Sequence, residues 1–418
     1  MRMIRLAENR DRPSVMKGEG RAPEGKKVAI FTDHIGGVYV FTVRLSEELK
    51  KRYSHEVHII TYESSSPREE TAVKKLAAAS HAMHLIPRSK TDQEDIDSIH
   101  AVLRKGRFDL FVPNYRHAAY AAAAKMSLRT PTGVVAVCHD DDESYYGLLE
   151  SYERIVDAFI CPAPSMEERL GQRMAHRKPD IRCIPHGVPV PDTDMPHYGG
   201  GPIRCVYQGR LEEDQKSVSH LIGVAADLER RHIPFTLDLI GDGPEEQRYK
   251  RMVEDLGLSG RVEFHGYKEW PESVSLLRNA HLTVLASRHE GFCLGLAELM
   301  GMGLPAIAFS CGGVIEQYVK DGVNGYVVPW GSVSLMADAI AGFYGNPEKW
   351  KSFSTEAAKE IRTNYNMALF AARYAALIDE TPLRDTKVRC WPRMRPLIAE
   401  RNWGTRVVEK MGNCLSLW

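Results

Sequence analysis

Two glutamates, Glu290 and Glu298, enclose a short segment whose residue types could bind an anionic ligand. The segment runs from a predicted strand, through a turn at Gly291, into a predicted helix. Backbone amides at a helix start lack partners within the helix, so they can bind phosphate oxygens, and glycine lets the backbone approach a ligand closely. The amides in question belong to Phe292, Cys293, Leu294 and Gly295. We therefore predict a phosphate site here.

The two glutamates are eight residues apart, slightly more than two helical turns, so within one helix they would project toward the same side. A carboxylate there can accept hydrogen bonds from two vicinal hydroxyls of a ligand. A simpler interpretation is that Glu290 favours the helix N-terminus electrostatically and that Glu298 is a solvated helix residue. For a strand, turn and helix taken alone, the simpler interpretation is favoured.

Arg210 and Lys216 form a second candidate group, because they follow another predicted strand and lie at the opening of a helix. Arginine offers a planar fork for phosphate oxygens and lysine a mobile point charge. Together they could neutralise a diphosphate leaving group as its bond to a sugar breaks. The acidic run 212–214 gives an equally good alternative, in which the two cations pair with their own neighbours.

An acidic run begins with Asp140 and Asp141 and directly follows His139, at the end of a strongly apolar strand. These aspartates could hold a divalent metal, cap the next helix or bind an acceptor substrate. We favour acceptor binding or capping and predict no metal site. His139 is a candidate catalytic residue because it emerges from the strand into the predicted cleft, although a hydrogen-bonded core histidine is the commoner case.

Gly36 and Gly37 follow the first predicted strand and would let the backbone approach a ligand from the other half of the chain. This loop lacks the G-x-G-x-x-G spacing of a dinucleotide site, as does the loop after residue 240. The sequence therefore argues against a nicotinamide-dependent dehydrogenase.

Short apolar runs alternate with amphipathic helical patterns, which is typical of βαβ units and parallel sheets. Strands are predicted at 27–33, 56–61, 82–86, 109–113, 133–139 and 158–162, and again at 203–208, 235–240, 262–265, 282–286 and 305–309. We therefore predict an α/β fold of two doubly wound, Rossmann-like domains that face each other across a cleft. Such sheets bind ligands at the carboxyl ends of their strands.

The length of 418 residues requires more than one core, and composition predicts where the domains meet. Residues 1–25 are polar and form a predicted mobile extension. The first domain spans 26–190 and the second 203–378, joined by a linker at 191–202 that is rich in Pro and Gly. Residues 379–418 are a predicted C-terminal helical segment that could pack back on the first domain. Helical patterns near 365–378 and near 396–411 close the chain, and one of them could make this crossing.

Lysine plus arginine equals aspartate plus glutamate at 55 each, so no net charge recruits nucleic acid. The eight cysteines show no C-x-x-C pair and no zinc-like spacing, which is typical of reduced, buried thiols and favours the cytoplasm. No secretory signal and no apolar run long enough to span a bilayer is present in the sequence. Peripheral membrane contact stays open, and the sequence does not predict the oligomeric state.

Taken together, these motifs resemble glycosyltransferase family 4, whose members have the GT-B fold. The resemblance covers residues 27–378 and depends on seven motifs that occur in the order found in the family. These are Gly36-Gly37, Ile184–Val188, Gly209–Lys216, Leu239–Pro244, Val262–Gly266, Glu290 with Glu298, and Gly312-Gly313 with Glu316.

The resemblance implies roles for residues in both domains. In the second, donor-binding domain, Arg210 and Lys216 correspond to the contacts of the donor diphosphate and Glu298 to the carboxylate that binds ribose. Glu290 corresponds to the glutamate near the transferred sugar, and the base is usually met where Gly266-Tyr267 lies.

In the first, acceptor-binding domain, the loop that closes over the phosphates corresponds to Gly36 and Gly37, and a histidine that approaches the sugar corresponds to His139. The chain departs from the family at His186, where asparagine is common, and in the acidic run 140–143. Acceptor contacts at Asp140 and Asp141 therefore stay open.

The resemblance also implies the reaction: transfer of a hexose from a nucleoside-diphosphate sugar to a hydroxyl acceptor, with retained anomeric configuration and no required metal or cofactor. UDP is the favoured nucleotide, with GDP and ADP as alternatives. A sugar-nucleotide epimerase would share the phosphate-binding loops but would need acid and base residues around the sugar ring. A non-catalytic binding subunit on the same scaffold is the second alternative.

Overall fold

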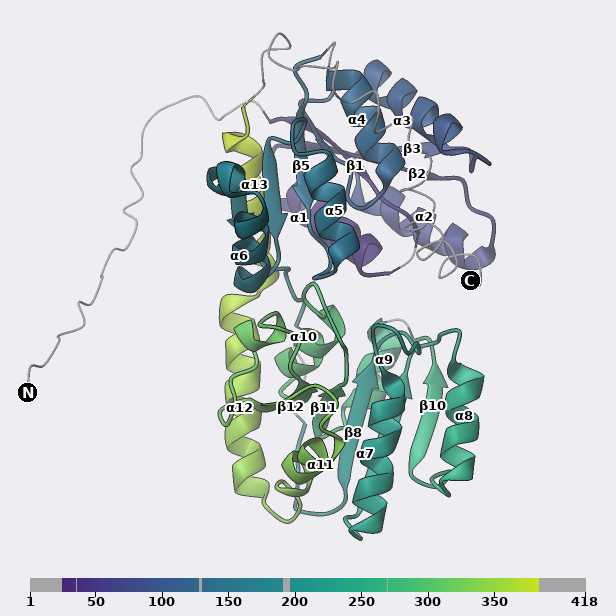
Figure 1. The fold of residues 1–418 in the computed structure, drawn as a ribbon, viewed down its shortest axis with the longest axis vertical. Helices are drawn as coiled ribbons and strands as arrows, with labels where there is room; N and C mark the ends of the chain where they lie inside the picture. The colour runs from purple at the N-terminus through teal and green to yellow at the C-terminus, as the bar shows by residue number, and fades with distance from the viewer. Residues whose placement is uncertain (1–24, 35, 128–129, 191–195, 269, 383–418) are drawn as a thin grey trace, which may run out of the picture.

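The computed structural model describes residues 25–34, 36–127, 130–190, 196–268 and 270–382. The predicted N-terminal extension, apart from its last residue, and the helix predicted near 396–411 lie outside these ranges. Among the helices described, none combines the length and the apolar composition that crossing a membrane requires. The described chain forms two α/β units, one above the other in Figure 1.

The first unit is built on a seven-stranded sheet with the order β3-β2-β1-β4-β5-β6-β7, in which every pairing is parallel. Its strands are β1 (Lys27–Phe31), β2 (Glu56–Tyr62), β3 (Ala82–Ile86), β4 (Leu110–Val112), β5 (Gly133–Val137), β6 (Ala158–Cys161) and β7 (Ile181–Cys183). Its helices are α1 (Gly37–Arg52), α2 (Pro67–Ala79), α3 (Asp92–Gly106), α4 (His117–Ser127), α5 (Glu143–Ser151), α6 (Pro164–Arg173) and the 3-10 helix η1 (Ala175–Asp180). The strand order reverses between β1 and β4, which is where doubly wound sheets bind ligands.

The second unit has a six-stranded parallel sheet with the order β10-β9-β8-β11-β12-β13. Its strands are β8 (Ile203–Gln208), β9 (Phe235–Ile240), β10 (Val262–Gly266), β11 (Leu282–Leu285), β12 (Ala306–Phe309) and β13 (Gly325–Val328). Its helices are α7 (Val218–Arg230), α8 (Glu246–Asp255), α9 (Trp270–Leu277), α10 (Leu294–Gly301), the 3-10 helix η2 (Ile315–Gln317), α11 (Val333–Ala341) and α12 (Pro347–Asn364). The corresponding reversal lies between β8 and β11, the strands that lead to Arg210 and Glu290.

The central strands are apolar throughout because helices cover both faces of each sheet. Strand β5 is buried along its whole length, and its side chains divide between two cores. Val135 and Val137 belong to the core beneath α1, whereas Val134 and Ala136 belong to the larger core on the opposite face. Alternation of side chains along a strand produces this division.

The structure confirms the predicted fold class, two doubly wound parallel sheets with C-terminal helices. Strands β7 and β13 were not predicted. Both are edge strands of three or four residues in which only the first residue is fully buried. Such strands lack the continuous apolar run by which the buried strands are recognised.

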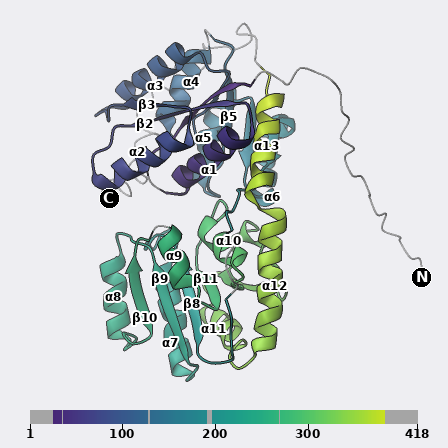
Figure 2. The same ribbon diagram turned by 180° about the vertical axis from the view of Figure 1, so that it is seen from behind.

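The last described helix, α13 (Met367–Glu380), leaves the second unit and packs against α1 of the first, as Figures 1 and 2 show from opposite sides. The predicted second domain extends to residue 378, whereas the chain already crosses back at α13, which corresponds to the first of the two helical patterns expected to make this crossing. The chain passes between the two units twice, once after β7 and once before α13. The two passages lie side by side, because the Val188 amide donates to the Tyr365 carbonyl at 2.8 Å. Gly187 is required there, since a Cβ atom would lie 2.7 Å from that of Phe370.

We predict that Phe370→Ala loosens α13 from the first unit. The ring is 2% exposed and packs against Phe41 and Tyr374, so its loss should cost about 3–5 kcal/mol of packing energy. Hydrogen exchange should then accelerate in α13 and α1, with a lower melting temperature. Leu369→Ala is the control, because Leu369 is 38% exposed on the same helix and should change stability by less than about 0.5 kcal/mol. Equal protection in both variants would contradict the packing role.

Candidate functional site

The loops that follow β5 and β11 meet between the two units. A Cβ atom on Gly291 would lie 1.9 Å from the His139 carbonyl oxygen and 3.0 Å from the Asp140 amide nitrogen. No side chain fits there without separating the units, so this contact requires glycine. The sequence predicts that Gly291 lets the backbone approach a ligand; in the structure, the group that comes this close is the backbone of the facing domain.

Lys216 and Glu290 form a buried ion pair at this meeting point. The Lys216 Nζ donates to Glu290 Oε1 at 2.6 Å, and the Ser287 hydroxyl donates to the same oxygen at 2.6 Å. The two charged side chains are 14% and 5% exposed. Burial by itself lowers the pKa of Lys216, but the carboxylate of Glu290 outweighs it and raises that pKa, so the lysine remains a cation.

Gln215 connects the candidate residues of the two domains. Its side-chain amide donates to Asp140 Oδ2 at 3.0 Å, and its carbonyl oxygen accepts from Arg210 at 2.6 Å. Arg210 also pairs with Glu212 at 2.9 Å, which is the neighbouring partner that the acidic run offered. The Arg210 side chain is 41% exposed, so its guanidinium keeps a solvent-accessible side toward which a ligand can bind.

Asp140 and His289 form a second contact across the domains, with 3.1 Å between Asp140 Oδ1 and His289 Nδ1. Burial raises the pKa of Asp140 above its ordinary value. Burial disfavours protonated His289, but the hydrogen bond and charge of Asp140 outweigh this and raise the pKa of His289. The pair therefore favours a protonated histidine at the entrance to the Glu290 site.

Glu298 lies in the second turn of α10 and is almost completely buried, whereas Glu290 lies in the loop before this helix. The two carboxylates therefore do not share a helical face, and the inference from their spacing does not apply. Glu298 Oε1 accepts from Arg44 of α1, and Oε2 accepts from the Gln208 amide at 3.3 Å. A Cβ on Gly295 would lie 2.7 Å from the Gln208 carbonyl oxygen, so this glycine lets α10 pack on β8.

The start of α10 has the predicted strand-turn-helix geometry. Cys293 stands at the N-cap with a left-handed backbone, φ 62°, and so turns the chain sharply into the helix. Phe292 is buried, and its ring lies 5.4 Å from that of His186. The first amides of α10, from Leu294 onward, are at the helix end that favours anions.

His139 and His186 form a neutral aromatic group beneath the site. Their rings stack with centroids 6.0 Å apart, and His139 Nε2 lies 2.9 Å from Asn114 Oδ1. Burial and the neighbouring His186 hold the pKa of His139 well below its ordinary value. Burial and the charge of Arg44 lower the pKa of His186 to about 3. At neutral pH, His139 can offer a hydrogen bond but no positive charge.

The remaining predicted residues lie around this centre. Gly36 adopts φ 90° before α1, and a Cβ on it or on Gly37 would meet open space. Gly266 also has a positive φ, 66°, and ends β10. Tyr267 is 50% exposed, and the guanidinium of Arg68 from α2 lies 4.3 Å from its ring centroid.

The acidic run divides between several tasks. Asp142 caps α5, because its side chain accepts from the Ser144 amide at 2.8 Å. Asp141 accepts from Tyr146 at 2.5 Å and pairs with Arg169, which also donates to the Gly312 carbonyl of the second unit. Capping, one of the two favoured interpretations, therefore applies to Asp142.

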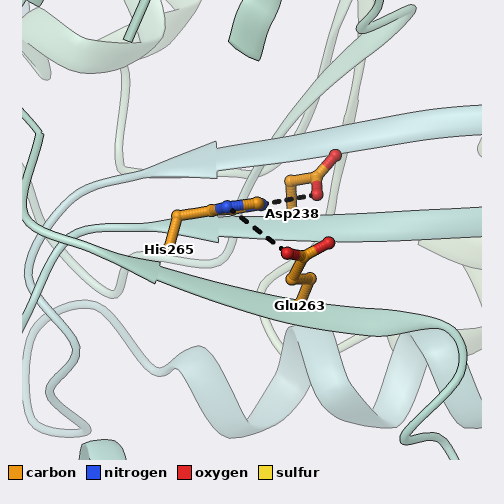
Figure 3. A group of neighbouring side chains, drawn as sticks. All are labelled: Asp238, Glu263 and His265. Atoms are coloured by element: carbon orange, nitrogen blue, oxygen red, sulfur yellow. Dashed lines mark hydrogen bonds and ion pairs between the residues drawn. The ribbon is translucent and has the colours of Figure 1, made fainter. Parts of the chain in front are cut away.

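Within the described residues, one group of three could hold a metal ion: Asp238, Glu263 and His265, whose ligand atoms lie within 4.8 Å of one another (Figure 3). His265 lies 2.7 Å from Asp238 and 3.8 Å from Glu263. The group sits on β9 and β10, at the opposite side of β8 from β11, which leads to Glu290. His265 lies where the pairing of β10 with β9 shifts register, between Phe264 and Gly266.

Gln215, Arg44 and Asn114 are three residues of the site that were not predicted as such from the sequence. Gln215 lies between Arg210 and Lys216, so its position in that motif could have indicated that it belongs to the site. Arg44 sits within an ordinary amphipathic helix, and Asn114 follows a short strand, with φ 55°. Their roles depend on contacts with residues 254 and 25 positions away, for which no local pattern exists.

Two doubly wound domains with charged residues gathered between their strand ends define the GT-B class of transferases. Residues 199–360 match the family described as Glycosyl transferases group 1, and residues 35–190 match Glycosyltransferase Family 4. These matches together span most of the chain. The protein belongs to the family 4, group 1 glycosyltransferases.

Curated relatives include other glycosyltransferases. An uncharacterised glycosyltransferase of Methanocaldococcus jannaschii is 25% identical over 355 residues, 81% of this chain and 93% of the relative. The UDP-N-acetylglucosamine–peptide N-acetylglucosaminyltransferase GtfA subunit of Streptococcus gordonii is 28% identical over 191 residues, 45% of this chain and 37% of the relative. The chain matches only 26% to 46% of the length of the first three curated relatives.

Two structures illustrate the shared fold. TarM of S. aureus, in complex with UDP and other ligands, has a TM-score of 0.70 at 14% identity and covers 85% of this chain and 100% of its own. HepE of Anabaena, in complex with UDP and glucose, has a TM-score of 0.69 at 16% identity, with coverages of 85% and 99%. At these identities, the likeness establishes the fold.

We predict that Gly291→Ala disrupts the contact between the domains. The added methyl group would overlap the His139 carbonyl, and relieving such a clash costs about 1–3 kcal/mol. The melting temperature should fall, and hydrogen exchange should accelerate in the loops after β5 and β11. Gly147→Ala is the matched control, because a Cβ there meets nothing within 4 Å and the site lies within α5. A G291A variant as stable as G147A would contradict the contact.

We predict that His186→Asn makes the protein less sensitive to acid. In the folded protein His186 stays neutral down to about pH 3, whereas in the unfolded chain it gains a proton near pH 6.5. Stability is therefore lost as the pH falls below 6.5. Between pH 6.5 and about pH 4.5 the wild type should lose roughly 2–3 kcal/mol more than the variant, by urea unfolding. Parallel losses in both proteins would contradict a neutral, buried His186.

Proposed function

We propose that this glycosyltransferase moves a hexose from UDP-hexose to a hydroxyl acceptor with retained anomeric configuration. The observation that carries the proposal is the buried Lys216–Glu290 pair at the start of α10, with the exposed side of Arg210 nearby. A lysine that remains charged, an arginine fork and helix-start amides supply what a departing diphosphate needs. In this proposal, residues 203–364 bind the donor, and residues 26–190 with α13 bind the acceptor.

Each donor group has a proposed partner. The diphosphate lies against Lys216, Arg210 and the amides of residues 292–295, and Gly36-Gly37 closes over it from the first domain. Glu298 accepts hydrogen bonds from the ribose hydroxyls, and the base lies beside Gly266-Tyr267. HepE, with the same fold, binds UDP and glucose, and this supports UDP as the nucleotide.

The transferred sugar lies near Glu290 and His139. Glu290 shares one oxygen between Lys216 and Ser287, so its second oxygen is the one proposed to accept from a sugar hydroxyl. His139 is neutral and can hydrogen-bond the sugar without competing for the charge on the leaving group. The acceptor hydroxyl then attacks from the face that the diphosphate leaves, and the departing phosphate oxygen takes its proton.

This route requires no metal, because Lys216, Arg210 and the helix-start amides neutralise the charge that develops on the diphosphate. Asp140 is proposed to contact the acceptor or the sugar, since it faces the second domain through Gln215 and His289. Asp141 is proposed to act indirectly, through the Arg169 contact that joins α6 to Gly312.

The test of this function is incubation with a panel of nucleotide sugars, with and without hydroxyl acceptors, in EDTA. UDP release that depends on an acceptor, with the anomeric configuration of the donor preserved in the product by NMR, would support the proposal. Epimerisation of the donor without acceptor would favour an epimerase. An inverted product would exclude same-face attack, and nucleotide binding without turnover across the panel would favour a binding subunit.

We predict that Lys216→Ala lowers kcat by about 10²–10³-fold, as expected for loss of one positioned group that stabilises leaving-group charge. The loss should appear in kcat more than in the dissociation constant of UDP, because the charge grows as the bond breaks. Steady-state kinetics with UDP-hexose measures both. Lys359→Ala, at an exposed position on α12, is the control and should behave as wild type. Unchanged kcat in K216A would reassign Lys216 to structure.

A further inference from the structure

Both carboxylate oxygens of Glu298 already have protein partners. One accepts from Arg44, which belongs to α1 of the opposite domain, and the other accepts from Gln208 at 3.3 Å. The Glu298 side chain is 6% exposed and that of Arg44 is 14% exposed. The carboxylate keeps further acceptor capacity, but Arg44 and Gln208 leave it almost no exposed surface. Arg44 makes the charge-assisted bond of the two and comes from the opposite domain, so it is the partner that a ribose entering between the domains meets.

The hydrogen bonds of the Arg44 guanidinium are incomplete. Within the described chain, its second amino nitrogen, Nη1, is buried and has no hydrogen-bond partner. A buried donor without a partner costs stability and offsets part of what the ion pair contributes. The Arg44–Glu298 ion pair therefore leaves one buried donor of the guanidinium without a hydrogen bond. Such a contact is easier for a ligand to replace than a fully hydrogen-bonded one.

A second arginine of the first domain also contacts a residue that is proposed to bind the donor. Arg68, on α2, lies over the ring of Tyr267 at 4.3 Å and donates to Asp242 at 2.8 Å. Tyr267 is the residue beside which the base is proposed to lie. Two arginines from two helices of the acceptor domain thus contact the proposed ribose and base residues.

We propose that Arg44 competes with the ribose of the donor for Glu298 and so sets the affinity of the enzyme for its nucleotide. The proposal depends on the assignment of Glu298 to ribose made above. When the 2′- and 3′-hydroxyls hydrogen-bond to the carboxylate of Glu298, Arg44 is released, and the ion pair that joins α1 to α10 is lost. Donor binding and the approach of the two domains are thereby coupled.

The test compares UDP with its 2′,3′-dideoxy analogue, which has no hydroxyl to offer Glu298. Arg44→Met keeps a long side chain at this position of α1 and removes the charge that competes for Glu298. By calorimetry, R44M should bind UDP roughly three- to tenfold more tightly than wild type, and the dideoxy analogue with unchanged affinity. Arg52→Met is the control, because Arg52 lies on the same helix, is 45% exposed and pairs with Glu48. It should match wild type for both ligands.

Equal or weaker UDP binding by R44M would overturn the competition, and so would a gain of the same size for the dideoxy analogue. If R44M does not fold, as judged by circular dichroism, Arg44→Lys replaces it. R44K keeps the charge with a shorter reach, so it should show a smaller gain for UDP alone, and no gain would overturn the proposal. A wild type that binds no UDP at millimolar concentration would instead refute the proposed donor, and the competition with it.

Discussion

The candidate site depends on the close approach of two backbones, at Gly291 in the second domain and at the peptide between His139 and Asp140 in the first. At this distance no side chain separates the domains. The charged groups beside this contact, Asp140 in one loop and His289 and Glu290 in the other, therefore lie close together. Asp140 reaches Gln215 and His289, and Arg44 reaches Glu298, only because this contact fixes the relative position of the two sheets.

Burial between the domains then determines the charge of each group. Lys216 keeps its proton because a carboxylate lies 2.6 Å away. Burial lowers the pKa of His139 and of His186, and the neighbouring His186 and the charge of Arg44, respectively, lower them further. A cationic Lys216 and two neutral imidazoles thus lie in the same region between the domains. The charged lysine suits a reaction in which negative charge develops on the leaving group at one side of a sugar. The neutral imidazoles suit the other side of the sugar, where only hydrogen bonds are needed.

The fold was largely predictable because buried parallel strands leave a strong local signal. The strands at Ala82–Ile86, Ile203–Gln208 and Phe235–Ile240 were predicted with the bounds that the structure shows. Edge strands β7 and β13 escaped prediction since half-exposed strands of three or four residues have no such signal. The return of α13 to the first sheet also has no local signal, because an apolar helical face does not specify which core it covers.

The sequence by itself determined the alternation of strands and helices, the loops that carry charge, and the order of motifs that identifies the family. Each strand, helix and loop pattern is local, since it depends on residues within about 15 positions of one another, and the order of the motifs can be read along the linear chain. Only the tertiary structure decided which charges meet: Lys216 with Glu290, Arg44 with Glu298, and Asp140 with His289. Those pairs join residues at least 74 positions apart, because strands distant in sequence end at the same edge of a sheet or face each other across the domains.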